Sequence, residues 1–139
     1  MSEEARISAF RRIRDIPYAI VAEMRDPAVK YPPELRALTK RIPPGNHLAI
    51  KAFIGGKWVL VDATWDLPLK KAGFPVNEDW DEISDTKKAV TPVNEVLHDT
   101  IEERVKYDVV LRSRKTEEQK ALYAEFVEKF NKWLEVIRA

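Results

Sequence analysis

Two adjacent glycines between apolar runs constrain the fold of this chain most strongly. Gly55-Gly56 separates residues 46–54 from residues 57–64, and both flanks are rich in β-branched and aromatic side chains. Both turn positions of a two-residue hairpin can require positive φ angles, which glycine adopts without steric cost. The sequence therefore predicts an antiparallel hairpin with a two-residue turn, in which Phe53 faces Trp58.

This register assigns each side chain of the hairpin to one of two faces. His47 and Asp62 fall on the same face as diagonal neighbours, about 7–8 Å apart at Cα, which their side chains can bridge. An imidazole N–H that donates to a carboxylate forms the base and orienting groups of a nucleophile–His–Asp site. A one-residue bulge at the turn would separate the two groups. Ordinary hairpins also contain such pairs, so a purely structural pairing stays open. The opposite face is almost wholly apolar and is expected to be buried, with Leu48, Ile50, Ala52, Ile54, Val59, Val61 and Ala63.

Apolar periodicity predicts the other elements. Residues 3–14 favour a helix, residues 18–24 a strand, and residues 34–39 a short helix within a proline-rich stretch. Thr116 and Gln119 have the spacing of a capping box, which predicts the start of a C-terminal helix. One apolar face of that helix is traced by Leu122, Phe126, Phe130, Trp133 and Ile137.

Two regions give weaker predictions. Residues 65–92 contain several prolines and no sustained period, which indicates a long loop that covers or binds something. Residues 94–112 are ambiguous: the first half favours helix, whereas VKYDVVL, 105–111, is also compatible with a strand. We predict a single α+β domain, 1–139. In it a small antiparallel sheet of 18–24, 46–54 and 57–64 packs against the N- and C-terminal helices.

Composition limits the function classes. The 139 residues carry a net charge of +1, which gives no field for attracting nucleic acid or anionic lipid. No apolar run reaches the roughly 18 residues of a membrane span, and the N-terminus lacks the apolar core of a signal peptide. We therefore expect a cytoplasmic protein with no nucleic-acid or membrane partner. Abundant Glu and Lys hint at thermostability.

Metal and cofactor binding are not expected. The chain has no cysteine, which excludes disulfides and thiolate zinc sites. His98 has acidic neighbours, but a lone histidine among carboxylates is usually part of a charged surface. The acidic segment 77–85 lacks the glycine and closing glutamate of a calcium-binding loop. No cofactor motif is present.

The hairpin resembles the His–Asp hairpin of the transglutaminase-like superfamily, which has the papain-like cysteine-protease fold. The matching pattern is W-x-x-V-D-x-T-W from Trp58 to Trp65, with His47 fifteen residues before Asp62. Upstream, RDIPYAIVAEM occupies the place of the family's helix, Ile-Pro turn and strand, with Asp15 where glycine is usual. The resemblance covers roughly residues 5–66. It implies that His47 and Asp62 descend from a catalytic pair.

The catalytic cysteine of that family has no counterpart here. Its position falls at or before Met1 and Ser2. Three explanations stay open: an inactive relative that binds a peptide or protein, an enzyme that uses Ser2 or a nucleophile from outside this chain, and a trimmed or redesigned chain. We expect a domain without acyl-transfer activity of its own, which acts as a scaffold or as a peptide- or protein-binding module. The alternative is a transglutaminase-like or cysteine-protease-like hydrolase with a borrowed nucleophile. The sequence does not determine the oligomeric state.

Two tryptophans are candidate binding residues. Trp65 closely follows Asp62 and is expected to line a cleft. Trp80 lies within the acidic segment and is expected either to cover the hairpin or, if exposed, to anchor a ligand. The predicted site is therefore His47 and Asp62 as the catalytic pair, with Trp65 and Trp80 as binding residues.

Overall fold

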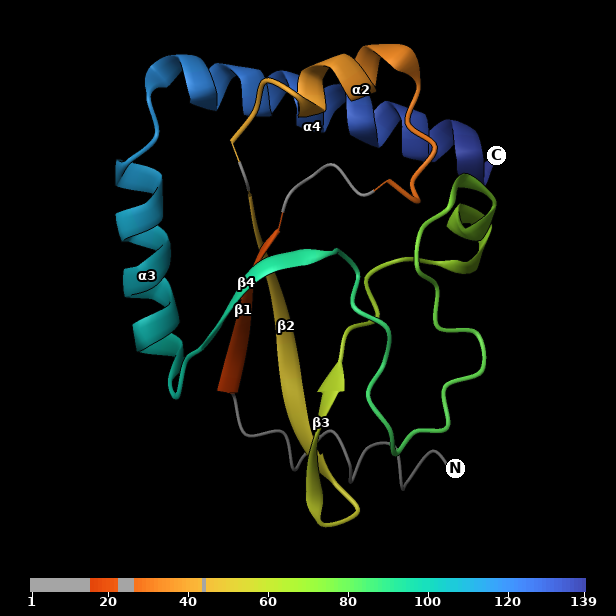
Figure 1. The fold of residues 1–139 in the computed structure, drawn as a ribbon, viewed down its shortest axis with the longest axis vertical. Coiled ribbons are helices and arrows are strands. Elements are labelled where there is room, and N and C mark those ends of the chain that lie inside the picture. Colours follow the sequence, from red (N-terminus) through yellow and green to blue (C-terminus); the bar gives the residue numbers. More distant parts are fainter. Residues whose placement is uncertain (1–15, 23–26, 44) are drawn as a thin grey trace.

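The protein combines helices with one four-stranded antiparallel sheet, as the computed structural model in Figure 1 shows. The structure describes residues 16–22, 27–43 and 45–139. The strand order is β3-β2-β1-β4, so β3 and β4 form the edges. The α+β class is therefore confirmed, whereas the predicted helix at 3–14 lies outside the described residues. The strands are β1 (Ile16–Ala22), β2 (Gly45–Ile54), β3 (Lys57–Val61) and β4 (Pro92–Leu97).

The predicted hairpin register is confirmed. Gly55 and Gly56 have φ angles of 58° and 82°, the positive values that the turn requires. Phe53 pairs with Trp58, and the ladder continues to the pairing of Ile50 with Val61. The strand ends there, so Asp62 follows β3 directly instead of pairing with a residue of β2.

The sheet is larger than predicted because residues 92–97 add a fourth strand beside β1. The first half of 94–112, which favoured helix in the sequence, therefore begins with strand residues instead. Residues 105–111, for which a strand was an option, are helical instead. The side chain of Thr100 accepts a hydrogen bond from the amide of Glu103 and so caps the helix that follows. The helical elements are α2 (Pro33–Thr39), the 3-10 helix η1 (Leu67–Ala72), α3 (Ile101–Ser113) and α4 (Glu117–Arg138).

The apolar face of the hairpin is buried only in part, contrary to expectation. Ala52 and Val59 are buried, but 46% of Leu48 is exposed. On the other face, Ala49 and Leu60 are buried and form a small cluster with Val90. Hydrophobic alternation therefore predicted the strands correctly but not which face is covered, because Val90 packs against Ala49 and Leu60 on the second face.

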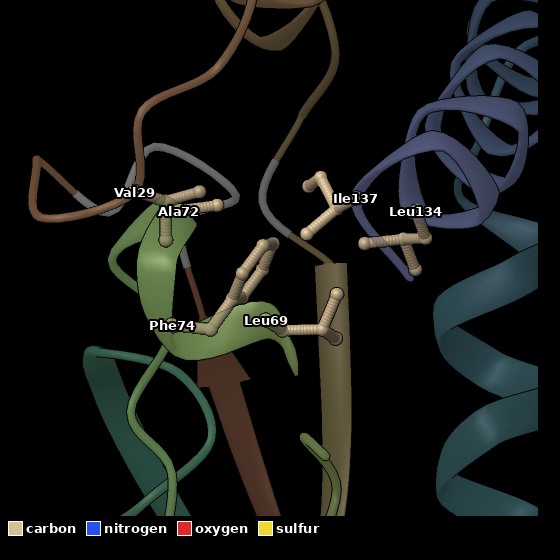
Figure 2. Packing of buried hydrophobic residues seen from close by; sticks show 6 residues of the cluster. All are labelled: Val29, Leu69, Ala72, Phe74, Leu134 and Ile137. Carbon is tan, nitrogen blue, oxygen red and sulfur yellow. The ribbon is translucent and has the colours of Figure 1, made fainter. Parts of the chain in front are cut away.

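The C-terminal helix does not pack directly on the sheet, which corrects the prediction. Among the described residues, α4 lies against α2 and η1. Figure 2 shows Leu134 and Ile137 of α4 facing Leu69 and Phe74 of the η1 region, with Val29 and Ala72 completing the cluster. The contacts of α4 are therefore with other helical elements and not with the described strands.

A second cluster joins α4 to α2. Phe126 is fully buried against Leu35 and Leu38, and it stacks on Phe130 at a ring-centroid distance of 5.3 Å. Tyr31 contacts the rings of both clusters. Burial of a side chain like Phe126 contributes about 1.5–3 kcal/mol to stability.

The capping box at Thr116 and Gln119 is confirmed and fixes the start of α4. In the described part of the chain, no helix has the length and apolar character needed to cross a bilayer.

Candidate functional site: the His47–Asp62 pair

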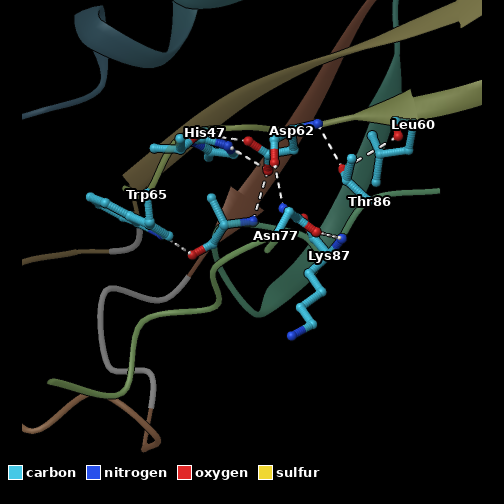
Figure 3. Close-up of polar contacts among 9 residues, drawn as sticks. His47, Leu60, Asp62, Trp65, Asn77, Thr86 and Lys87 are labelled. Atoms are coloured by element: carbon cyan, nitrogen blue, oxygen red, sulfur yellow. Dashed lines mark hydrogen bonds and ion pairs between the residues drawn. The ribbon is translucent and has the colours of Figure 1, made fainter. Parts of the chain in front are cut away.

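His47 and Asp62 are in direct contact, as the hairpin register predicts. The Nε2 atom of His47 lies 2.9 Å from Oδ2 of Asp62 (Figure 3). His47 lies near the start of β2, and Asp62 lies one residue beyond the end of β3. The side chain of Asp62 is 2% exposed and that of His47 is 18% exposed. The carboxylate is therefore held inside the protein, while part of the His47 side chain reaches the surface.

The Asp62 carboxylate accepts hydrogen bonds from three groups. The hydroxyl of Thr64 donates to Oδ1 at 2.6 Å, and the amide of Ala89 donates to Oδ2 at 2.7 Å, which His47 also contacts. Burial by itself raises the pKa of this carboxyl. The hydrogen bonds from His47, Thr64 and Ala89 outweigh burial, so the net pKa of Asp62 is lowered. Asp62 is therefore ionised at neutral pH, and neutral His47 must carry its proton on Nε2.

Residues 85–90, which we call the strap, run beside the edge strand β3 and support Asp62. The amide of Thr86 donates to the carbonyl of Leu60 at 3.0 Å, and Oγ1 of Thr86 accepts from the amide of Asp62 at 2.8 Å. Oδ1 of Asp85 accepts from the amide of Leu60 at 2.8 Å. These bonds satisfy backbone groups that an edge strand would otherwise expose, and they fix the backbone on both sides of Val61.

A side-chain amide ties the strap to the preceding loop. Nδ2 of Asn77 donates to the carbonyl of Asp62 at 3.1 Å, while its Oδ1 accepts from the amide of Lys87 at 2.8 Å. Asn77 thus bridges the end of the hairpin and the strap. The contact holds Asp62 through its carbonyl, in addition to the contacts of its amide and its carboxylate.

Trp65 is a packing residue in this structure. Its ring lies 4.6 Å from that of Phe74, centroid to centroid, and its Nε1–H donates to the carbonyl of Ala89 at 2.6 Å. Ala89 therefore contacts Asp62 through its amide and Trp65 through its carbonyl. Trp65 lies near His47 in Figure 3, and its expected role in lining a cleft and binding a ligand stays a prediction.

Trp80 is not brought to the pair. Its indole N–H donates to the carbonyl of Ser84 within its own loop, and the side chain is half-buried. It lines an open hollow of about 300 Å³ formed by residues of 76–87, without His47 or Asp62. The structure therefore gives Trp80 a place in the acidic loop, and its binding role also stays a prediction.

Within the described ranges, no three His, Cys, Asp or Glu side chains gather in a way that suits a metal ion. His98, which the sequence placed on a solvated surface, is buried instead. Its ring lies 4.8 Å from the ring of Tyr107 of α3.

The arrangement can position an imidazole and support positive charge on it. Nε2 is occupied by Asp62, so Nδ1 is the nitrogen left to exchange a proton with another group. Sequence reasoning found His47 and Asp62 but did not assign Thr64 to the site, and it missed Asn77, Thr86 and Ala89. Thr86 and Ala89 act partly or wholly through main-chain groups, which every residue type has, so the sequence does not mark these positions. Asn77 and Thr86 lie in a loop without hydrophobic periodicity, so their positions relative to the hairpin could not be predicted from spacing.

Comparisons of this chain with protein-family models, with curated proteins and with solved structures find no match.

Proposed function

We propose that this chain is a transglutaminase-like domain that retains a His–Asp pair, has no acyl-transfer activity of its own, and acts as a scaffold or peptide- or protein-binding module. We also place it in the cytoplasm. The contact between His47 Nε2 and Asp62 Oδ2 carries the proposal. It occurs within the hairpin whose W-x-x-V-D-x-T-W pattern resembles that superfamily.

Three further observations support the proposal. Three groups hold the carboxylate, which is more than an incidental surface ion pair has. The side chain of His47 stays partly exposed, at 18%. The 139 residues contain no thiol, so this segment cannot form a thioester intermediate by itself.

A second candidate is a hydrolase whose nucleophile comes from Ser2 or from outside this chain. The orientation of His47 favours this candidate as well, since a base already paired with its orienting carboxylate lacks only a nucleophile. Labelling by a fluorophosphonate that is lost in Ser2→Ala would favour catalysis by Ser2 over the inactive domain.

The proposed ancestry is tested by installing the missing thiol. In Ser2→Cys, we expect iodoacetamide to react with an apparent thiol pKa below the ordinary value of about 8.5, because a nearby imidazolium stabilises the thiolate. The matched variant Ser2→Cys/His47→Ala is expected to return the pKa to the ordinary value. Equal pKa values in the two variants would remove the support for a relict catalytic site.

The absence of activity and the binding role need separate measurements. The unaltered chain is expected to incorporate no dansylcadaverine into casein, and incorporation that disappears in His47→Ala would overturn the proposal. A tryptic digest of casein is expected to shift the imidazole NMR signals of His47. Signals unchanged at saturating peptide would argue against a peptide-binding role at this pair.

A further inference from the structure

The turn between α3 and α4 forms an open groove away from the His–Asp pair. Its volume is about 560 Å³. In Figure 1, α3 lies on the opposite side of the molecule from η1 and the loop that follows it. Neither His47 nor Asp62 lines the groove, so a ligand held by its lining residues is not bound by the pair. The groove is lined by Val109, Arg112, Ser113, Lys115, Lys120 and Tyr123.

The apolar part of the groove is unusually exposed. Val109 is 62% exposed and Tyr123 is 41% exposed. Val105 lies one helical turn before Val109 on the same side of α3 and is 54% exposed. Exposed apolar side chains gathered at a concave surface often mark an interaction site.

The charged part of the groove is basic. Lys120 pairs with Glu117, and the ammonium of Lys115 lies 5.2 Å from the ring centroid of Tyr123. Within the described part of the chain, Arg112 has no carboxylate partner, although it lines the groove. Arg112 and Lys115 thus offer cationic donors beside an apolar wall, in a chain whose net charge is only +1.

We propose that this groove docks an acidic segment of a partner protein that carries apolar side chains. Carboxylates of the segment meet Arg112 and Lys115, and its apolar side chains cover Val109 and Tyr123. A small molecule is disfavoured because such ligands are mostly enclosed by their sites, whereas these walls are widely exposed. A nucleic acid is disfavoured because the groove has few cations, whereas a duplex or strand presents a continuous row of phosphates.

The test uses the full chain and a fluorescein-labelled synthetic peptide built from glutamates with leucines at helical spacing. Fluorescence anisotropy is expected to show binding that weakens as NaCl is raised from about 0.05 M to about 0.5 M, because salt screens exposed charges. A peptide with glutamine in place of every glutamate is expected to bind at least tenfold more weakly. Equal binding of the two peptides would overturn the proposal.

Matched variants locate the site. Arg112→Glu/Lys115→Glu is expected to weaken binding at least tenfold, and Val109→Ser severalfold. Arg41→Glu/Lys71→Glu changes the net charge equally at two exposed positions outside the groove and is expected to have little effect. Circular dichroism checks that all variants fold. Equal losses in the two charge-reversal variants would indicate general electrostatics and overturn the proposal.

Competition distinguishes the partner class. Unlabelled single-stranded DNA and vesicles of phosphatidylcholine with phosphatidylglycerol are expected to displace the glutamate–leucine peptide poorly. Displacement by either at lower concentration than by the unlabelled peptide would overturn the proposal in favour of that class. The His47→Ala variant is expected to bind the peptide as the unaltered chain does, so this result is independent of the proposed function.

Discussion

At the scale of single residues, Asp62 is the most heavily used side chain of the site. Its carboxylate accepts from an imidazole, a hydroxyl and a main-chain amide, and its own amide and carbonyl are bonded as well. A neutral asparagine has one acceptor oxygen for the same donors. Hydrogen bonds to a charged group contribute about 1.5–3 kcal/mol each, and an unpaired buried donor is costly.

We therefore expect Asp62→Asn to lower the free energy of unfolding by about 2–4 kcal/mol at pH 7, measured by urea denaturation. The pKa of Asp62 is lowered in the folded state, so its ionisation stabilises the fold above the unfolded pKa of about 3.9. That contribution is lost as pH falls through the folded pKa. The difference between the variant and the unaltered chain should thus shrink below about pH 4. Asp79→Asn, at an exposed position, is the control. A difference that stays constant with pH would contradict this account.

At the scale of elements, the hairpin was predictable and the strap was not. Gly55-Gly56 determines which residues face each other, and that register alone brings His47 to Asp62. The strap has no such signal, because Ala89 acts through its main-chain amide and carbonyl. The start of α3 was not predicted, since 94–112 stayed ambiguous, although Thr100 caps that helix and its capping role outweighs the strand preference of the valines that follow.

Another element boundary depends on Gly73, which ends η1 with a φ of 88°. A Cβ at this position would overlap the carbonyl oxygen of Ala28. Left-handed backbone costs a non-glycine residue about 1–2 kcal/mol, and the overlap adds to this. We expect Gly73→Ala to destabilise the protein by at least about 2 kcal/mol in urea denaturation. Gly56→Ala is the matched control, with a φ of 82° and open space around it, and should cost about 1 kcal/mol. Equal losses would mean that the contact between η1 and residue 28 is not tight.

At the scale of the whole molecule, Ala89 connects the site to the hydrophobic core. Its amide donates to Asp62, and its carbonyl accepts from Trp65, which packs on Phe74 and Phe130. Phe74 belongs to the cluster that joins η1 to α4. The pair and the C-terminal helix are therefore linked through the backbone of one residue, Ala89, and the aromatic ring of Trp65, although α4 does not lie on the sheet.

This connection predicts energetic coupling between Trp65 and Asp62. Trp65→Phe keeps an aromatic ring against Phe74 but removes the bond to Ala89, which is expected to cost about 1 kcal/mol. Once that bond is lost, the strap holds Asp62 less firmly, so adding Asp62→Asn should cost less than it does alone. Urea denaturation of both single variants and the double variant is expected to give a coupling energy of about 0.5 kcal/mol or more. Leu38→Ala with Asp62→Asn is the control pair, because Leu38 packs in the α2–α4 cluster, and its effects should add. If the free-energy losses of Trp65→Phe and Asp62→Asn were additive as well, the bond from Trp65 to Ala89 would not help to hold Asp62 in place.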